Sequence, residues 1–296
     1  MRSNLLLLFA VSLAWASDYL FFIRWADAAL PPLAIGAVTS IIAAIVLFLL
    51  VWLVLKRPLL PILREAPLVP VVLGATSVAW PRITVAYAEE SITPDIAAIT
   101  GTTVPILTLL VSIFILHQQN FSPLRMLGVL VALGGLAVFV GLGGIEGRNT
   151  ADAILVLMSS GVTFVFAGFY AQSRAARFDK AALTVWVMAA GAAMLAVPAF
   201  VLEFDHIAMP PAAALASLVA SGTIAMALAY LGYFILIERA GPSFAALYAY
   251  LVPPLGVLIG VIFLGEALTL RHGGGLALVL VGLWLITGRQ AKPVSG

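Results

Sequence analysis

Long apolar segments occupy most of this 296-residue chain and limit what it can fold into. A helix needs roughly 20 apolar residues to cross the hydrocarbon core of a bilayer. Ten segments reach or approach that length, at residues 4–23, 33–55, 68–87, 94–116, 124–143, 153–172, 182–202, 213–237, 243–264 and 274–288. We therefore predict an all-α membrane protein with ten transmembrane helices.

The composition supports a membrane protein and argues against several other classes. Hydrophobic residues make up 63% of the chain and charged residues only 9%, whereas soluble domains average about 25% charged residues. A net charge of +2 does not indicate a nucleic-acid partner. The chain has no cysteine and only three scattered histidines, so we expect no disulfide, no metal site and no cofactor. The expected surroundings are a lipid bilayer.

The distribution of basic residues predicts the orientation in the membrane. Lys and Arg concentrate in cytoplasmic loops. With a cytoplasmic N-terminus, eleven basic residues fall on the cytoplasmic side and three on the other, while Arg82 falls within a segment. We therefore expect both termini in the cytoplasm of a multi-pass protein.

The two halves of the chain resemble each other at an offset of 148 residues. Glu90, Pro94 and Pro105 recur as Glu238, Pro242 and Pro253. This divides the chain into a first repeat at 1–148 and a second at 149–296, with five predicted helices in each. Because five is odd, the second repeat starts on the opposite face of the membrane and is inverted.

An inverted repeat suits transport by alternating access, because exchanging the conformations of two similar halves moves an opening from one face to the other. The alternative is that duplication merely built a larger helical bundle. The chain shows no enzyme motif and no pair of carboxylates placed for hydrolysis, so we predict no catalytic residues. These observations favour a transporter with a central site for a small molecule.

Two charged residues, Asp18 and Arg82, fall deep within predicted helices. A charge at the centre of a bilayer costs about 2.5 kcal/mol or more and suggests function. Both lie about 21 Å from the cytoplasmic ends of their helices at 1.5 Å per residue, so their side chains can meet. Arg82 suits a substrate carboxylate or phosphate, and Asp18 suits an amino group or a proton. The alternative is a structural ion pair between two helices.

Aromatic and hydroxyl residues complete the predicted site. Trp15 and Tyr19 share a helical face with Asp18, and aromatic rings around a charge suit an amphipathic ligand or a cation. Pro81 predicts an interruption of the third helix, next to Trp80. The 148-residue offset maps Arg82 onto Tyr230, near Tyr233, and Thr100 onto Tyr248. The predicted substrate-binding residues are Trp15, Asp18, Tyr19, Trp80, Arg82, Thr100, Tyr230, Tyr233 and Tyr248.

The fifth and tenth predicted helices differ from the others. They carry many glycines, among them Gly128, Gly135 and Gly282, and almost no polar side chains. Small residues permit close helix packing in membranes. We expect these helices to form a peripheral scaffold or a dimer surface, and the protein to be a monomer or a homodimer.

The residues around the repeated prolines resemble a known family. The segment from Ala225 to Tyr230, followed by Gly241-Pro242, Pro253 and Gly265-Glu266, resembles the EamA repeat of ten-helix members of the drug/metabolite transporter superfamily. The first half, from Ala86-Tyr87 through Pro94, Pro105 and Gly134, is similar to the same repeat. It departs from the pattern in having His117-Gln118 where the second half has Gly265-Glu266.

This resemblance implies a secondary transporter of a bacterial inner membrane, often an exporter of amino acids or related metabolites. It also implies a cavity between helices 3, 4, 8 and 9, walled by helices 1, 2, 6 and 7. Asp18 occupies the kind of position where small multidrug relatives carry a coupling carboxylate. The leading hypothesis is export of amino acids or metabolites. The alternatives are proton-coupled efflux of lipophilic cations and a non-transporting membrane scaffold.

Overall fold

The computed structural model describes residues 2–18, 30–89, 91–92, 100–101, 103–140, 151–206, 209–265 and 269–287. Within these ranges the regular structure is entirely helical. The first half contains α1 (Arg2–Ser17), α3 (Pro32–Leu49), η2 (Leu50–Leu55), α4 (Pro61–Glu65), α5 (Leu68–Gly74), η3 (Ala75–Ala79), α6 (Trp80–Glu89), α8 (Thr103–Leu110), η4 (Val111–Ile115) and α9 (Pro123–Val140). The second half contains α10 (Ala151–Arg174), α11 (Lys180–Glu203), η6 (Phe204–His206), α12 (Ala212–Ser221), η7 (Gly222–Leu228), α13 (Ala229–Ala240), α14 (Pro242–Ala245), α15 (Tyr248–Leu264) and α16 (Leu270–Thr287).

The helices agree with the prediction of a multi-pass membrane protein. Seven helical runs of the described chain are long and apolar enough to cross a bilayer. Three shorter apolar helices, Arg2–Ser17, Thr103–Ile115 and Pro123–Phe139, occupy the other predicted segments. That all ten cross the membrane stays a prediction.

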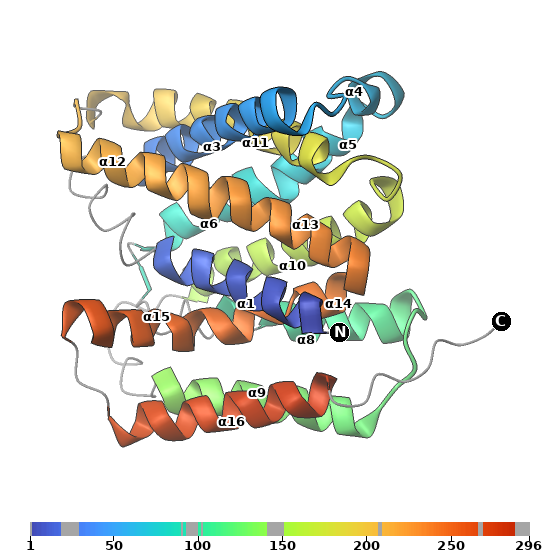
Figure 1. The fold of residues 1–296 in the computed structure, drawn as a ribbon. Coiled ribbons are helices and arrows are strands. Elements are labelled where there is room, and N and C mark those ends of the chain that lie inside the picture. The colour runs from blue at the N-terminus through green and yellow to red at the C-terminus, as the bar shows by residue number, and fades with distance from the viewer. Residues whose placement is uncertain are drawn as a thin grey trace.

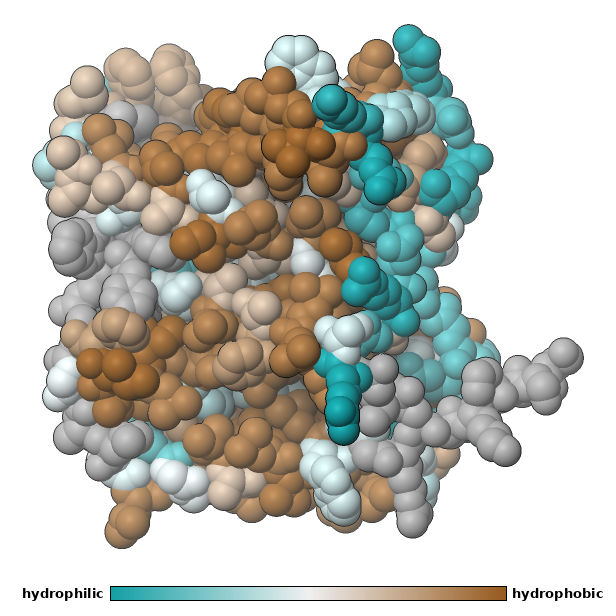
Figure 2. Space-filling view, in the orientation of Figure 1, coloured by the Kyte–Doolittle hydropathy of each residue, from teal (hydrophilic) through white to brown (hydrophobic). Residues whose placement is uncertain are grey.

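The helices lie side by side, and the beginning of α1 and the end of α16 lie at the same end of the bundle (Figure 1). Apolar side chains cover the face seen in Figure 2, and hydrophilic residues gather at the end where α1 begins. Many large apolar side chains are exposed, such as Trp284 at 69%. An apolar surface of this extent is suited to contact with lipid.

Packing takes place largely between the two halves of the chain. α3 packs against α11, and α9 packs against α16 at one edge of the molecule (Figure 1). α1 packs against α13, α15 and η7 of the second half, while α10 packs against α6, α8 and η3 of the first half. Each of these contacts has a counterpart 148 residues away, so the offset seen in the sequence also relates the tertiary contacts.

Two glycines at equivalent positions sit at equivalent helix crossings. A Cβ on Gly74 would lie 2.8 Å from Ala190 Cβ, and one on Gly222 would lie 2.7 Å from Ile42 Cβ. Ile42 and Ala190 are themselves 148 residues apart. These distances are too short for a side chain, so each crossing requires glycine.

The peripheral pair α9 and α16 also meets through glycines. A Cβ on Gly282 would lie 2.5 Å from the carbonyl oxygen of Gly128, and one on Gly275 would lie 2.5 Å from Phe139. The two helices lie at the edge of the bundle (Figure 1), and their role as a peripheral scaffold or a dimer surface stays a prediction.

The predicted interruption at Pro81 takes a different form in the structure. The helix continues through Pro81 to Glu89, and the irregularity is the π-helical turn η3 just before it. The N–H of Trp80 donates to Ala75 O, five residues back. The π-helical turn η7 occupies the equivalent place in the second half, where the N–H of Ala229 donates to Ile224 O. Such turns are rare and often occur at functional sites.

Candidate functional site

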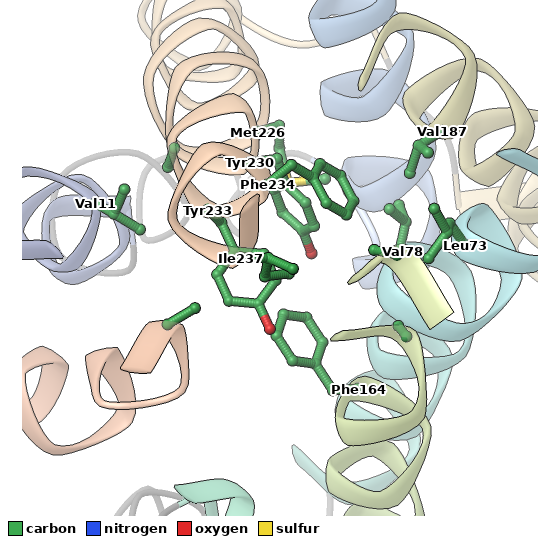
Figure 3. Close-up of a cluster of buried hydrophobic side chains, with 14 of the residues drawn as sticks. Val11, Leu73, Val78, Phe164, Val187, Met226, Tyr230, Tyr233, Phe234 and Ile237 are labelled. Atoms are coloured by element: carbon green, nitrogen blue, oxygen red, sulfur yellow. The ribbon is translucent and has the colours of Figure 1, made fainter. Parts of the chain in front are cut away.

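An aromatic cluster forms where α1 meets three other helices. The ring of Trp15 on α1 lies 4.4 Å from Tyr248, 5.5 Å from Tyr230, 5.6 Å from Tyr233 and 6.5 Å from Phe164, measured between centroids. These partners come from α15, α13 and α10. Figure 3 shows Tyr230 and Tyr233 projecting from one helix, with the Tyr233 hydroxyl near the Phe164 ring. The rings of Tyr233 and Phe164 lie 5.2 Å apart.

The two charges singled out in the sequence meet in the structure. Arg82 Nη2 lies 3.6 Å from Asp18 Oδ2, with the side chains 24% and 9% exposed. Arg82 is on α6, and Asp18 directly follows α1. At 3.6 Å the pair is longer than the usual 2.7–2.9 Å of a charge-assisted hydrogen bond. The ion pair is therefore loose.

Part of this polar site has no partner among the described residues. Asp18 Oδ1 and Ser221 Oγ are both buried, and neither has a described partner within hydrogen-bonding distance and angle. The Ser221 hydroxyl lies beside the Asp18 carboxylate. Arg82 Nη2 also donates to Met226 Sδ at 3.1 Å, which is a weak acceptor. Buried polar atoms without partners are costly. The site is therefore equipped to receive further hydrogen-bonding groups.

Two donors of the aromatic cluster bind backbone carbonyls. Tyr230 OH donates to Ser77 O at 2.7 Å, and Trp15 Nε1 donates to Ala225 O at 3.0 Å. Ser77 lies in η3 and Ala225 in η7. The aromatic cluster is thus tied to both π-helical turns.

The remaining predicted residues lie elsewhere or outside the described chain. Trp80 is 42% exposed, and its Nε1 donates to Ser159 Oγ at 3.0 Å. Thr100 is buried ahead of α8, and its carbonyl accepts from Thr103 Oγ1 at 2.7 Å. Tyr19 lies outside the described residues. Substrate binding by each of these residues stays a prediction.

The sequence reasoning missed Phe164 and Ser221. The 148-residue offset relates Phe164 to Ala16 and Ser221 to Leu73, so the repeat carried no signal for either. Ser221 could have been identified by its position, because it is a polar residue within an apolar run, directly before the repeated Gly222. Phe164 is one of many apolar residues on α10, and its contact with the aromatic cluster follows only from the packing.

Among the described residues, no group of three or more His, Asp or Glu side chains could hold a metal ion. The site instead combines one carboxylate, one guanidinium and several aromatic rings. Opposite charges beside apolar surface can bind a small amphipathic molecule by its charged groups and its apolar part together.

The chain matches the model of the EamA-like transporter family twice, at residues 2–141 and 152–288. It is 32% identical to the uncharacterized inner membrane transporter YedA of Escherichia coli K12, over 97% of this chain and 92% of that protein. It is 27% identical to a probable terminal-alkyne amino-acid exporter of Streptantibioticus cattleyicolor, over 77% of this chain and 75% of that protein.

A solved crystal structure shares the fold. The two chains superpose with a TM-score of 0.82 at 22% identity, covering 97% of each. The predicted localisation, a multi-pass protein of the inner membrane, is confirmed by the family match and by YedA.

Proposed function

The chain belongs to the EamA-like transporter family, and we propose that it exports amino acids or related small metabolites by alternating access through a central site. The observation that carries the proposal is the loose Asp18–Arg82 ion pair beside the aromatic cluster. The family supplies transport as the general activity. The substrate class is argued from the chemistry of this site.

The charges of the site match those of a zwitterion. Arg82 can bind a carboxylate through two parallel hydrogen bonds, and Asp18 can accept from an ammonium group through its unpartnered Oδ1. A zwitterion can therefore replace the mutual attraction of the two residues with two separate ion pairs, without leaving a buried charge unpaired.

The aromatic cluster suits the rest of such a substrate. Aromatic rings provide apolar contact area and also attract a cationic group through their π faces. A relative at 27% identity is named as a probable amino-acid exporter, which supports the same substrate class.

We further propose that the halves 1–148 and 149–296 form inverted repeats with both termini in the cytoplasm. The packing of α1 on the second half and of α10 on the first supports the correspondence of the two halves. The excess of basic residues on the expected cytoplasmic side supports the orientation of the termini. Exchange of conformation between the halves would open the site alternately to each face of the membrane.

Transport in proteoliposomes tests this function. Purified protein would be reconstituted and assayed for exchange of radiolabelled amino acids, alongside Arg82→Ala and the control Arg64→Ala, an exposed residue outside the site. We expect exchange by the unmodified chain and by Arg64→Ala. In Arg82→Ala we expect a loss of about tenfold or more, as the net contribution of hydrogen bonds to a charged group implies. Unchanged transport of every amino acid by Arg82→Ala would overturn the role of Arg82.

A second candidate function is proton-coupled efflux of lipophilic cations. The buried Asp18 carboxylate near aromatic rings favours it. A carboxylate that binds a proton and a cation alternately couples the transport of the cation to the transport of protons. This function predicts transport of a lipophilic cation that depends on a pH gradient and is lost in Asp18→Asn. Zwitterion exchange without a pH gradient distinguishes the first proposal from the second.

A further inference from the structure

We propose that Trp15 and Tyr230 are positioning residues that hold the present conformation, and that Thr163 and Arg82 take over their hydrogen bonds in the opposite conformation. The proposal rests on the alternating access proposed above. Thr163, Ser77 and Ala225 thereby have a role in the transport cycle. The polar atoms of Trp15 and Tyr230 bind backbone carbonyls.

The two carbonyl acceptors occupy equivalent places in the two halves. Ser77 and Ala225 are 148 residues apart, and each lies inside a π-helical turn. Both residues are buried. Each carbonyl accepts from a side chain of the other half, because Tyr230 binds Ser77 O and Trp15 binds Ala225 O. The two hydrogen bonds therefore tie the halves together at matched points.

Each carbonyl has lost its ordinary α-helical donor, for a different reason. The donor for Ser77 O would be the N–H of residue 81, but Pro81 has none. The donor for Ala225 O would be the N–H of Ala229, but that group binds Ile224 O in the π-helical turn. A buried carbonyl needs a donor, and an aromatic side chain of the opposite half supplies it in both cases.

The donors themselves are not equivalent. The counterpart of Tyr230 is Arg82, and the counterpart of Trp15 is Thr163. In the present structure Arg82 Nη2 binds Met226 Sδ, on the residue directly after Ala225. Thr163 Oγ1 donates to Ser160 O of its own helix at 3.0 Å. Both counterparts therefore carry a donor that is engaged in a weaker or purely local contact.

Exchange of conformation between the halves exchanges these contacts. Arg82 then donates to Ala225 O as Tyr230 now donates to Ser77 O. Thr163 then donates to Ser77 O, and because its side chain is shorter than that of Trp15, α10 must lie closer to η3 than α1 now lies to η7. The helices are placed for this change, because α10 packs against η3 as α1 packs against η7. The move of Arg82 onto a carbonyl weakens its pair with Asp18, so how well the Asp18 carboxylate is paired depends on the conformation.

Distances between spin labels test the exchange, and the chain has no cysteine to remove first. One labelled pair, Leu68→Cys with Arg239→Cys, lies at one end of the helical runs Leu68–Ala88 and Ala212–Ala240. The other pair, Val85→Cys with Leu215→Cys, lies at the opposite end. All four positions are exposed. Double electron–electron resonance spectroscopy on the reconstituted protein measures the label-to-label distances at each end, and their distribution gives the ratio of the two conformations.

The variants remove single donors. Tyr230→Phe keeps the ring and deletes the hydroxyl, so it should shift the ratio about fivefold toward the opposite conformation, as the net worth of one hydrogen bond implies. Thr163→Val, added to the Tyr230→Phe chain, should reverse most of this shift. It deletes the proposed donor of Ser77 O in the opposite conformation, whereas Ser160 O, its acceptor in the present conformation, lies inside α10 and keeps a helical donor. The controls are Tyr250→Phe, whose buried hydroxyl has no partner among the described residues, and Ser160→Ala, whose hydroxyl binds only its own helix.

The exchange is overturned if Tyr230→Phe moves the distances no more than Tyr250→Phe, or if Thr163→Val leaves the shift unchanged or deepens it. If Tyr230 and Thr163 had only a structural role, their variants would lower the unfolding temperature but would not shift the ratio of the two conformations in opposite directions. Transport by the same preparations separates the two proposals. Absence of amino-acid exchange in the unmodified chain overturns the proposed function, whereas active exchange with unresponsive distances overturns only the contact exchange.

Discussion

Arg82 Nη2 and Asp18 Oδ2 lie 3.6 Å apart, and a second oxygen of the same carboxylate, Oδ1, is buried without a hydrogen-bond partner among the described residues. The two side chains are close enough for their opposite charges to attract each other, but the hydrogen-bonding capacity of the Asp18 carboxylate is not filled. A closed structural ion pair would use both carboxylate oxygens. The open geometry is what distinguishes this pair as a candidate substrate site.

Removal of one member of the pair should cost more stability than removal of both. Arg82→Met leaves a buried carboxylate without its partner, a loss of about 3 kcal/mol or more. The double variant Asp18→Asn with Arg82→Met removes both charges and should recover most of that loss. Thermal unfolding in detergent, measured as a double-mutant cycle, gives the coupling energy. Additive losses would show that the two side chains do not interact.

The helix crossing at Gly74 should not tolerate a side chain. Gly74→Ala places its Cβ 2.8 Å from Ala190 Cβ, so we expect a loss of about 1–3 kcal/mol from overpacking. The matched control is Gly134→Ala on α9, where a new Cβ meets nothing within 4 Å. The control should be neutral or stabilising, because alanine favours helix more than glycine. Equal unfolding temperatures for both variants would contradict the tight crossing.

Lys180 should stabilise the junction between α10 and α11. Its buried Nζ donates to the carbonyls of Ala175, Ala176 and Phe178, and lies 3.2 Å from Glu238 Oε1. Lys180→Met deletes every one of these bonds and should lower stability by about 2 kcal/mol. The exposed Arg177→Met provides the comparison, since surface ion pairs contribute little. The readout is again the unfolding temperature in detergent.

Glu203 should stabilise the beginning of α3. Its Oε1 and Oε2 accept from the backbone N–H groups of Leu33 and Ala34, at 3.0 and 2.8 Å. These N–H groups have no partner within the helix. Glu203→Ala should therefore cost about 1 kcal/mol, and Glu203→Gln, which keeps one acceptor oxygen, should cost less. Hydrogen exchange at the first turn of α3 measures the effect locally. Faster exchange only at distant helices would argue against this capping role.

Much of the fold could be predicted from the sequence because each helix must be apolar along its whole length to lie in a membrane. All ten predicted segments contain a helix of the structure, and the repeat predicted that the halves correspond. Asp18 and Arg82 could be identified as candidates because a buried charge is costly in any arrangement of helices. The similarity of the two halves also predicted Tyr230 and Tyr248 as counterparts of polar residues.

The tertiary structure alone decided which side chains meet. A helix that is apolar on every side has no amphipathic pattern to show which face points inward, so the contact of Phe164 with Trp15 could not be predicted. The same holds for the carbonyls of Ser77 and Ala225, since any backbone carbonyl can be an acceptor once a helical bond is lost. The sequence by itself determined an apolar, two-fold repeated membrane chain with two charges, Asp18 and Arg82, deep within its predicted helices. Packing between the halves decided where the donors point, because those distances depend on how the helices cross.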